Sequence, residues 1–121
     1  MSRIERVREL QDRTKKFALR IIKAFTRLPK SEEARVLGRQ LLRSGTSVAA
    51  NYRATCRARS AADFISKIST VTEEADETLF WLELLVEADL VRPKVVESLL
   101  TECEELVRIF SASLATAKSN R

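Results

Sequence analysis

Helix-breaking residues are scarce in this sequence, and their positions divide it into four segments. The only prolines are Pro29 and Pro93; Ser31 follows Pro29 at the first break, and Ser60 marks the third point where an apolar pattern begins again. Serine at a helix start accepts a hydrogen bond from a backbone N–H of the first turn, and proline suits the first helical position but not the interior. We therefore expect helices over about residues 2–28, 32–58, 61–88 and 93–117.

The residues between these breaks favour helix throughout. Ala, Leu, Glu, Arg and Lys dominate, and apolar side chains recur three and four residues apart in every segment. A chain of 121 residues is long enough to bury a core as a single domain, residues 1–121. Four helices with short connections predict an all-α, antiparallel up-down-up-down four-helix bundle.

Small side chains crowd the middle of the second expected helix, around Gly45. Glycine in a helix interior costs about 1 kcal/mol relative to alanine, so we expect another helix to come close there. The expected partner is the flank of the third helix that carries Lys67, Glu74 and Trp81, within the subunit or from the next one. We expect its glutamates to pair with Lys67 or with arginines such as Arg43 or Arg53. The candidate packing residues are Ser44, Gly45, Ser47, Asn51, Glu74 and Glu77.

The C-terminal half of the third expected helix is apolar on nearly every side. Packing against two neighbouring helices cannot cover such a surface. The uncovered part, centred on Phe80, Trp81 and Leu84, predicts contact with another subunit or a ligand.

Charge is distributed unevenly along the chain, whose net charge is +5. Residues 1–30 hold ten basic and three acidic residues, whereas residues 60–92 hold two and eight. One face of the first helix forms a basic ridge, made of Arg6, Arg13, Lys16, Arg20, Lys23 and Arg27. This ridge indicates either an ordinary solvated face or a surface that binds RNA or DNA phosphates without sequence preference. The candidate nucleic-acid-binding residues are Arg13, Lys16, Arg20, Lys23, Arg27, Arg53, Arg57 and Arg59. Complementary docking of the basic and acidic parts is the alternative.

Residues for catalysis or cofactor binding are not assembled in this sequence. There is no histidine, and Cys56 and Cys103 are far apart, so we expect free, half-buried thiols, no zinc or di-iron site and no nucleophile paired with a base. No glycine-rich phosphate loop, apolar leader or membrane span is recognisable. We expect a non-enzymatic cytoplasmic protein with no metal, no cofactor and no membrane partner.

Two segments resemble a known family. Residues 40–53 (QLLRSGTSVAANYR), with Arg59, Ser60 and Phe64 beyond them, and residues 67–85, which include EEADET and WLELL, are similar to the four-helix-bundle family named after the 23S rRNA intervening-sequence protein. The likeness extends over roughly residues 10–115. Many members of that family continue after the asparagine with a Glu-Gly ending, which this chain lacks.

The resemblance implies a homo-oligomeric ring, typically a homopentamer. Relatives include basic accessory proteins of diversity-generating retroelements, which implies a possible nucleic acid and a possible reverse transcriptase as partners. The family has no established catalytic residues to transfer. Two functions therefore stay open: an oligomer that binds nucleic acid through its basic face, and a purely structural or protein-interaction scaffold.

Overall fold

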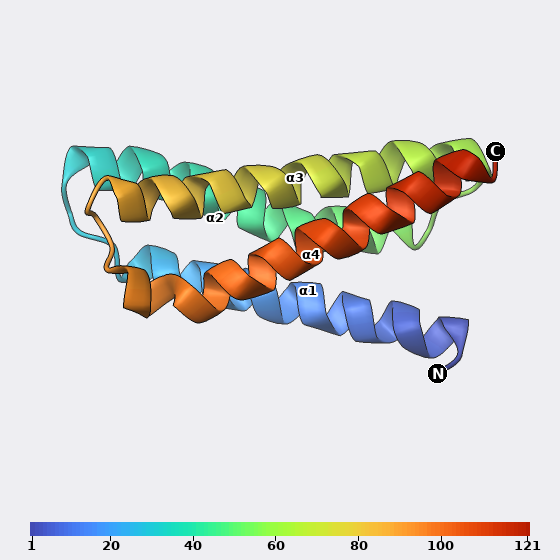
Figure 1. The fold of residues 1–121 in the computed structure, drawn as a ribbon, viewed down its shortest axis with the longest axis horizontal. Helices are drawn as coiled ribbons and strands as arrows, with labels where there is room; N and C mark the ends of the chain where they lie inside the picture. The colour runs from blue at the N-terminus through green and yellow to red at the C-terminus, as the bar shows by residue number, and fades with distance from the viewer.

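The computed structural model describes all 121 residues as four α-helices without strands. These are α1 (Arg3–Thr26), α2 (Glu32–Thr55), α3 (Ala61–Glu87) and α4 (Pro93–Ser119). Successive helices run in opposite directions and lie side by side in an elongated bundle (Figure 1). The all-α four-helix prediction is confirmed, although α1 and α2 end slightly earlier than expected and α4 ends slightly later.

Serine side chains cap the first three helices, as predicted for Ser31 and Ser60 and as the structure shows for Ser2. Ser2, Ser31 and Ser60 each accept a hydrogen bond from the backbone N–H three residues ahead, at 3.1, 3.3 and 3.0 Å. At the start of α3 the Asp63 carboxylate also accepts from the Arg59 backbone N–H at 3.1 Å. These bonds satisfy N–H groups that a helix start leaves without an intrahelical partner.

The turn between α3 and α4 closes the end of α3. Asp89 has a φ of 60°, and it is the only residue other than glycine with a positive φ. The backbone N–H of Asp89 donates to the Val86 carbonyl and that of Leu90 to the Leu85 carbonyl, both at 3.0 Å. This pattern is a Schellman motif, which ends the helix and leads the chain to Pro93 at the start of α4.

The core lies along the shared axis of the bundle. All four helices contribute to one cluster of buried apolar side chains; its fully enclosed members include Phe17, Ile21, Leu41, Ile68, Leu82 and Phe110. Thr14 is also fully buried, and its hydroxyl donates within α1 to the carbonyls of Leu10 and Gln11. None of the four helices combines the length and the apolarity that crossing a membrane requires.

The first and last helices separate at one end of the bundle. The N-terminal part of α1 and the C-terminal part of α4 diverge in Figure 1, and a cavity of about 940 Å³ lies between them. Ile4, which the apolar pattern of α1 assigns to the core, is 65% exposed beside this cavity. The periodicity of α1 predicts one continuous buried face, but α4 covers only part of it.

The small residues of α2 serve two neighbours instead of one. A Cβ at Gly45 would lie 2.7 Å from both γ carbons of Ile21 in α1, and one at Gly38 would lie 2.6 Å from Leu28 Cδ1. The expected partner for Gly45 was α3, and this expectation is wrong. Ser44 does face α3: the buried Thr78 hydroxyl donates to Ser44 Oγ at 2.9 Å. Gly38 and Gly45 allow α1 to approach α2, and Ser44 joins α2 to α3.

Of the ion pairs expected for the α3 glutamates, the structure contains those with Arg43 of α2. The Arg43 guanidinium contacts the carboxylates of both Glu74, at 3.3 Å, and Glu77. The Trp81 ring N–H donates to Glu77 as well, at 3.3 Å. Lys67 instead pairs with Asp63 one turn earlier in α3. Ser47 and Asn51 interact within α2, where the Asn51 amide donates to the Ser47 carbonyl and hydroxyl at 2.9 and 2.7 Å.

Candidate nucleic-acid interface

The basic ridge expected on α1 is not one continuous free surface. The Arg13 guanidinium donates to both carboxylate oxygens of Glu102 in α4, at 2.8 and 2.7 Å, and lies 3.1 Å from Glu105. The bidentate pair with Glu102 raises the pKa of Arg13 further above its already high value. Arg13 therefore ties α1 to α4 where we had expected a phosphate contact, because the fold brings acidic residues of α4 beside it.

Two further residues of the ridge also have partners within the chain. Lys16 pairs with Asp12 one turn earlier at 2.9 Å, and Asp12 raises the pKa of Lys16. Arg20 donates to the Ser98 hydroxyl of α4 at 2.9 Å. Both contacts are exposed, so they hold the side chains only weakly. Lys23 and Arg27, at the other end of α1, have no carboxylate partner.

A second concentration of positive charge lies between α1 and α2. A groove of about 580 Å³ is bordered by Arg8 and Lys15 of α1, by Arg53 in the last turn of α2 and by Arg57, two residues beyond the end of α2. Seven residues, or roughly 10 Å of helix, separate the two α1 cations. The antiparallel packing of the two helices brings both pairs to the same groove.

The groove is open to anions for two reasons. Its α2 wall carries the small side chains of Ala49 and Ala50, which leave space between the longer basic side chains. Its one acidic residue, Asp12, is paired with Lys16, whereas none of the four cations makes an ion pair. Arg8 and Lys15 were not among the candidates. Their seven-residue spacing was the available signal, but only the packing of α1 on α2 joins them to Arg53 and Arg57.

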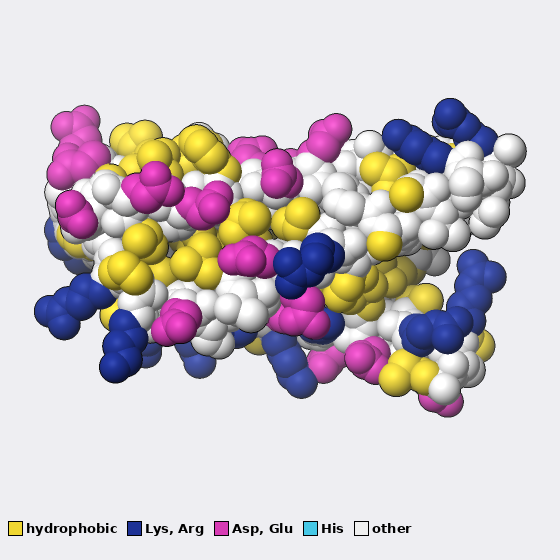
Figure 2. Space-filling view, viewed as in Figure 1, with side chains coloured by type: hydrophobic (Ala, Val, Ile, Leu, Met, Phe, Trp, Pro, Cys, Tyr) yellow, Lys and Arg dark blue, Asp and Glu magenta, His cyan; other side chains and the backbone are white.

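The remaining basic candidate, Arg59, lies away from this groove. Arg59 lines the larger cavity at the diverging ends of α1 and α4, together with Arg3, Arg8 and Arg57. Arg8 and Arg57 thus border both spaces, so positive charge continues from the α1–α2 groove around the end of the bundle. On the face drawn in Figure 2, basic side chains follow the α1 edge, whereas acidic side chains gather over α3 and α4.

The outer surface of α3 retains apolar side chains. Phe80 is 52% exposed, whereas Trp81 and Leu84 are half-buried. The Phe80 and Trp81 rings meet edge to face, with their centroids 5.1 Å apart. Hydrophobic side chains flanked by acidic ones are visible over this part of the bundle in Figure 2. The sequence-based expectation of an uncovered apolar surface therefore has its clearest support at Phe80.

The two cysteines occupy different environments. Cys56 is exposed at the end of α2, and Cys103 is fully buried, with its thiol 3.5 Å from the Ala75 carbonyl. Burial raises the pKa of the Cys103 thiol to about 12. No group of three potential metal-ligating side chains occurs in the structure.

The fold places this chain in the class of small all-α four-helix bundles. The family model described as 23S rRNA-intervening sequence protein matches residues 8–112. A crystal structure of a protein of unknown function from the S23 ribosomal protein family of Bacteroides thetaiotaomicron is 35% identical, with a TM-score of 0.79 over 86% of this chain and 96% of that one. A comparison with curated proteins found no match. This chain belongs to the 23S rRNA-intervening sequence protein family.

Proposed function

We propose that this protein is a non-enzymatic, homo-oligomeric binder of RNA or DNA that contacts the phosphate backbone through the groove between α1 and α2. The observation that supports the proposal is a group of four cations around one groove without carboxylate partners: Arg8 and Lys15 of α1, Arg53 of α2 and Arg57 just beyond α2. Such groups bind phosphates by releasing counterions, and they carry no information about base sequence.

The proposal predicts how steeply the affinity for nucleic acid falls as the salt concentration rises. If all four cations of a protomer contact phosphates of a single strand, the logarithm of the affinity falls with that of the salt concentration with a slope of about −2.8. Affinity for a mixed-sequence RNA then drops about 50-fold between 50 and 200 mM NaCl. The affinity of an oligomer that engages several grooves at once should fall still more steeply with salt concentration.

The decisive variant reverses the charge of the two cations at the end of α2 and just beyond it, Arg53→Glu with Arg57→Glu. The matched control, Arg108→Glu with Lys118→Glu, makes the same change in net charge at exposed positions of α4 that do not border the groove. Fluorescence anisotropy with labelled RNA and DNA should show binding lost in the groove variant and largely kept in the control. Equal loss in both variants, or affinity that does not change with salt, contradicts the proposal.

Self-association is the second part of the proposal, and the exposed apolar surface of α3 supports it. Phe80→Arg should yield smaller species in multi-angle light scattering, because an arginine cannot be buried in an apolar contact without a partner. Leu19→Arg is the matched control, since Leu19 of α1 is 53% exposed and Phe80 is 52% exposed. An unchanged mass for Phe80→Arg, or the same loss in both variants, argues against assembly through α3.

A structural or protein-interaction scaffold without nucleic-acid binding is the second candidate. The observation in its favour is that Arg13 and Arg43 both neutralise acidic residues of the same chain, at Glu102 and at Glu74 and Glu77. Sedimentation velocity with and without RNA separates the two functions. A sedimentation coefficient that RNA leaves unchanged at low salt favours the scaffold.

A further inference from the structure

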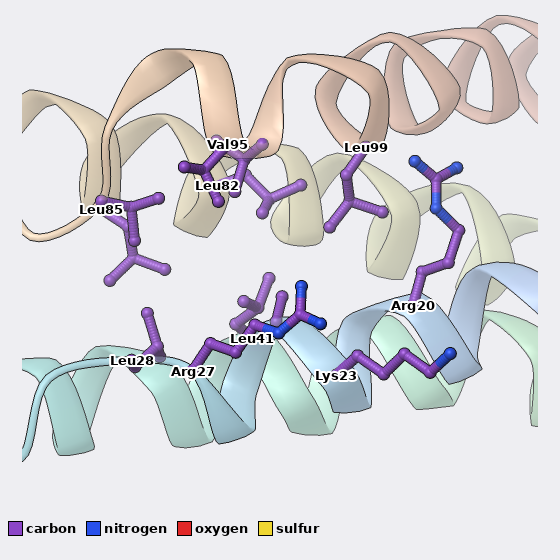
Figure 3. Close-up of a pocket in the computed structure, with 12 residues that line it drawn as sticks. Arg20, Lys23, Arg27, Leu28, Leu41, Leu82, Leu85, Val95 and Leu99 are labelled. Atoms are coloured by element: carbon purple, nitrogen blue, oxygen red, sulfur yellow. The ribbon is translucent and has the colours of Figure 1, made fainter.

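A separate cavity of about 280 Å³ opens between α1, α3 and α4, at the end of the bundle near the α3–α4 turn. Nine of its twelve lining residues are hydrophobic. In Figure 3, Leu82, Leu85 and Leu99 lie on one side of the cavity and Leu28 and Leu41 on the other. The interior is therefore apolar, and it arises because α1 and α4 touch over only a short stretch.

All three polar residues that line the cavity are cations. Arg20 and Lys23 of α1 and Arg27, the C-cap residue of α1, are three and four residues apart and border the α1 side of the cavity (Figure 3). No acidic residue lines it, and none of the three cations makes an ion pair. Arg20 also donates to the Ser98 hydroxyl, a contact that is exposed and leaves its guanidinium free to bind a ligand.

We propose that this cavity binds an amphipathic anion, with the alkyl chain between the leucines and a carboxylate at Arg20, Lys23 and Arg27. The apolar walls and the three cations together favour such a ligand. An uncharged apolar molecule would make no use of the three cations, and a free phosphate would leave the apolar walls empty. A guanidinium and a carboxylate form strong charge-assisted hydrogen bonds at such an opening.

The volume of the cavity limits the length of the chain that it accepts. A group the size of a water molecule occupies about 30 Å³. The cavity of about 280 Å³ therefore holds roughly nine methylene groups. A saturated carboxylate about as long as decanoate therefore fills the space. Affinity should rise about three- to fourfold with each added methylene up to this length and then level off.

Isothermal titration calorimetry with the full-length protein tests this expectation. The probes are hexanoate, octanoate, decanoate, dodecanoate and palmitate, each kept below the concentration at which it forms micelles. One saturable site per protomer, with an affinity that levels off near decanoate, supports the proposal. Affinity that continues to rise to palmitate, or binding that does not saturate, indicates detergent-like adsorption and overturns it.

Two variants test where the probe lies. Lys23→Glu with Arg27→Glu should weaken decanoate at least tenfold and leave decanol unaffected, whereas Arg108→Glu with Lys118→Glu should leave both unchanged. Val95, which lines the cavity and is 65% exposed, can be enlarged without disturbing the buried core. Val95→Trp should therefore block both probes. Wild-type affinity for decanoate in either the charge-reversal variant or Val95→Trp overturns the proposal.

This site is independent of the groove proposed for nucleic acid. The two share no lining residue. Arg53→Glu with Arg57→Glu should therefore retain decanoate binding while RNA binding is lost. Loss of decanoate binding in this folded groove variant would place the anion at the α1–α2 groove and overturn the assignment to the cavity.

Discussion

Replacing Gly45 with alanine tests how α1 packs on α2. The new Cβ would lie 2.7 Å from Ile21 Cγ1 and Cγ2 and 3.1 Å from its Cβ. Ile21 is fully buried, and a β-branched side chain has one strongly preferred rotamer in a helix. The clash can therefore be relieved only if α1 moves away from α2.

The expected cost comes from two opposing effects. Overpacking of a core costs about 1–3 kcal/mol, and three close contacts with a rigid side chain favour the upper part of that range. Alanine recovers about 1 kcal/mol in helix propensity. We expect Gly45→Ala to lower the free energy of unfolding by about 1–2 kcal/mol, or the melting temperature by about 3–10 °C in a domain of this size.

Gly38→Ala is the matched control. Its closest contact, at 2.6 Å, is the Cδ1 atom at the end of the Leu28 side chain, which can rotate away, and the next contacts are with Phe25 at 3.2 and 3.3 Å. The gain in helix propensity is the same at both positions. Gly38→Ala should therefore leave stability within about 0.5 kcal/mol of the wild type.

Urea denaturation followed by circular dichroism measures both variants, and a double-mutant cycle with Ile21→Ala identifies the cause. Without the γ carbons of Ile21, Gly45→Ala should no longer be destabilising, which gives a coupling energy of about 1 kcal/mol or more. The reasoning is refuted if Gly45→Ala is as stable as the wild type, or if its cost is the same in the Ile21→Ala background.

Three other predictions concern individual side chains. Arg13→Ala should cost about 1–2 kcal/mol of stability in urea denaturation, because it leaves the partly buried Glu102 carboxylate without its bidentate partner; a cost near zero would mean that α1 and α4 do not depend on this pair. Ellman's reagent at pH 8 should label only Cys56 in the native protein, because burial holds the pKa of Cys103 at about 12; two thiols reacting at equal rates would contradict this. Hydrogen bonds from the Lys67 side chain and the Arg59 backbone lower the pKa of Asp63 below its ordinary value of 3.8. The stability that Asp63 contributes is therefore present above its unfolded-state pKa and lost as pH falls through its folded-state pKa, so that Asp63→Asn should flatten the decline in stability between about pH 5 and pH 2. An unchanged pH profile would refute that assignment.

The number, type and order of the helices could be predicted because their signals are local. Ser31 and Ser60 cap the helices that follow them, and Pro93 begins α4, whatever the rest of the chain does. Apolar spacing within each helix also predicts most of the core. The same spacing could not show that Ile4 stays exposed, because exposure depends on how far α4 extends over α1.

The candidate sites depended on contacts between helices. Charge along the sequence indicated a basic surface, but the fold removes Arg13 from it by placing Glu102 beside the guanidinium. The fold also joins Arg8 and Lys15 to Arg53 at the α1–α2 groove. Helical periodicity assigns a residue to a face of its own helix, and only the packing angle and the offset between helices decide which residues of a neighbouring helix meet that face.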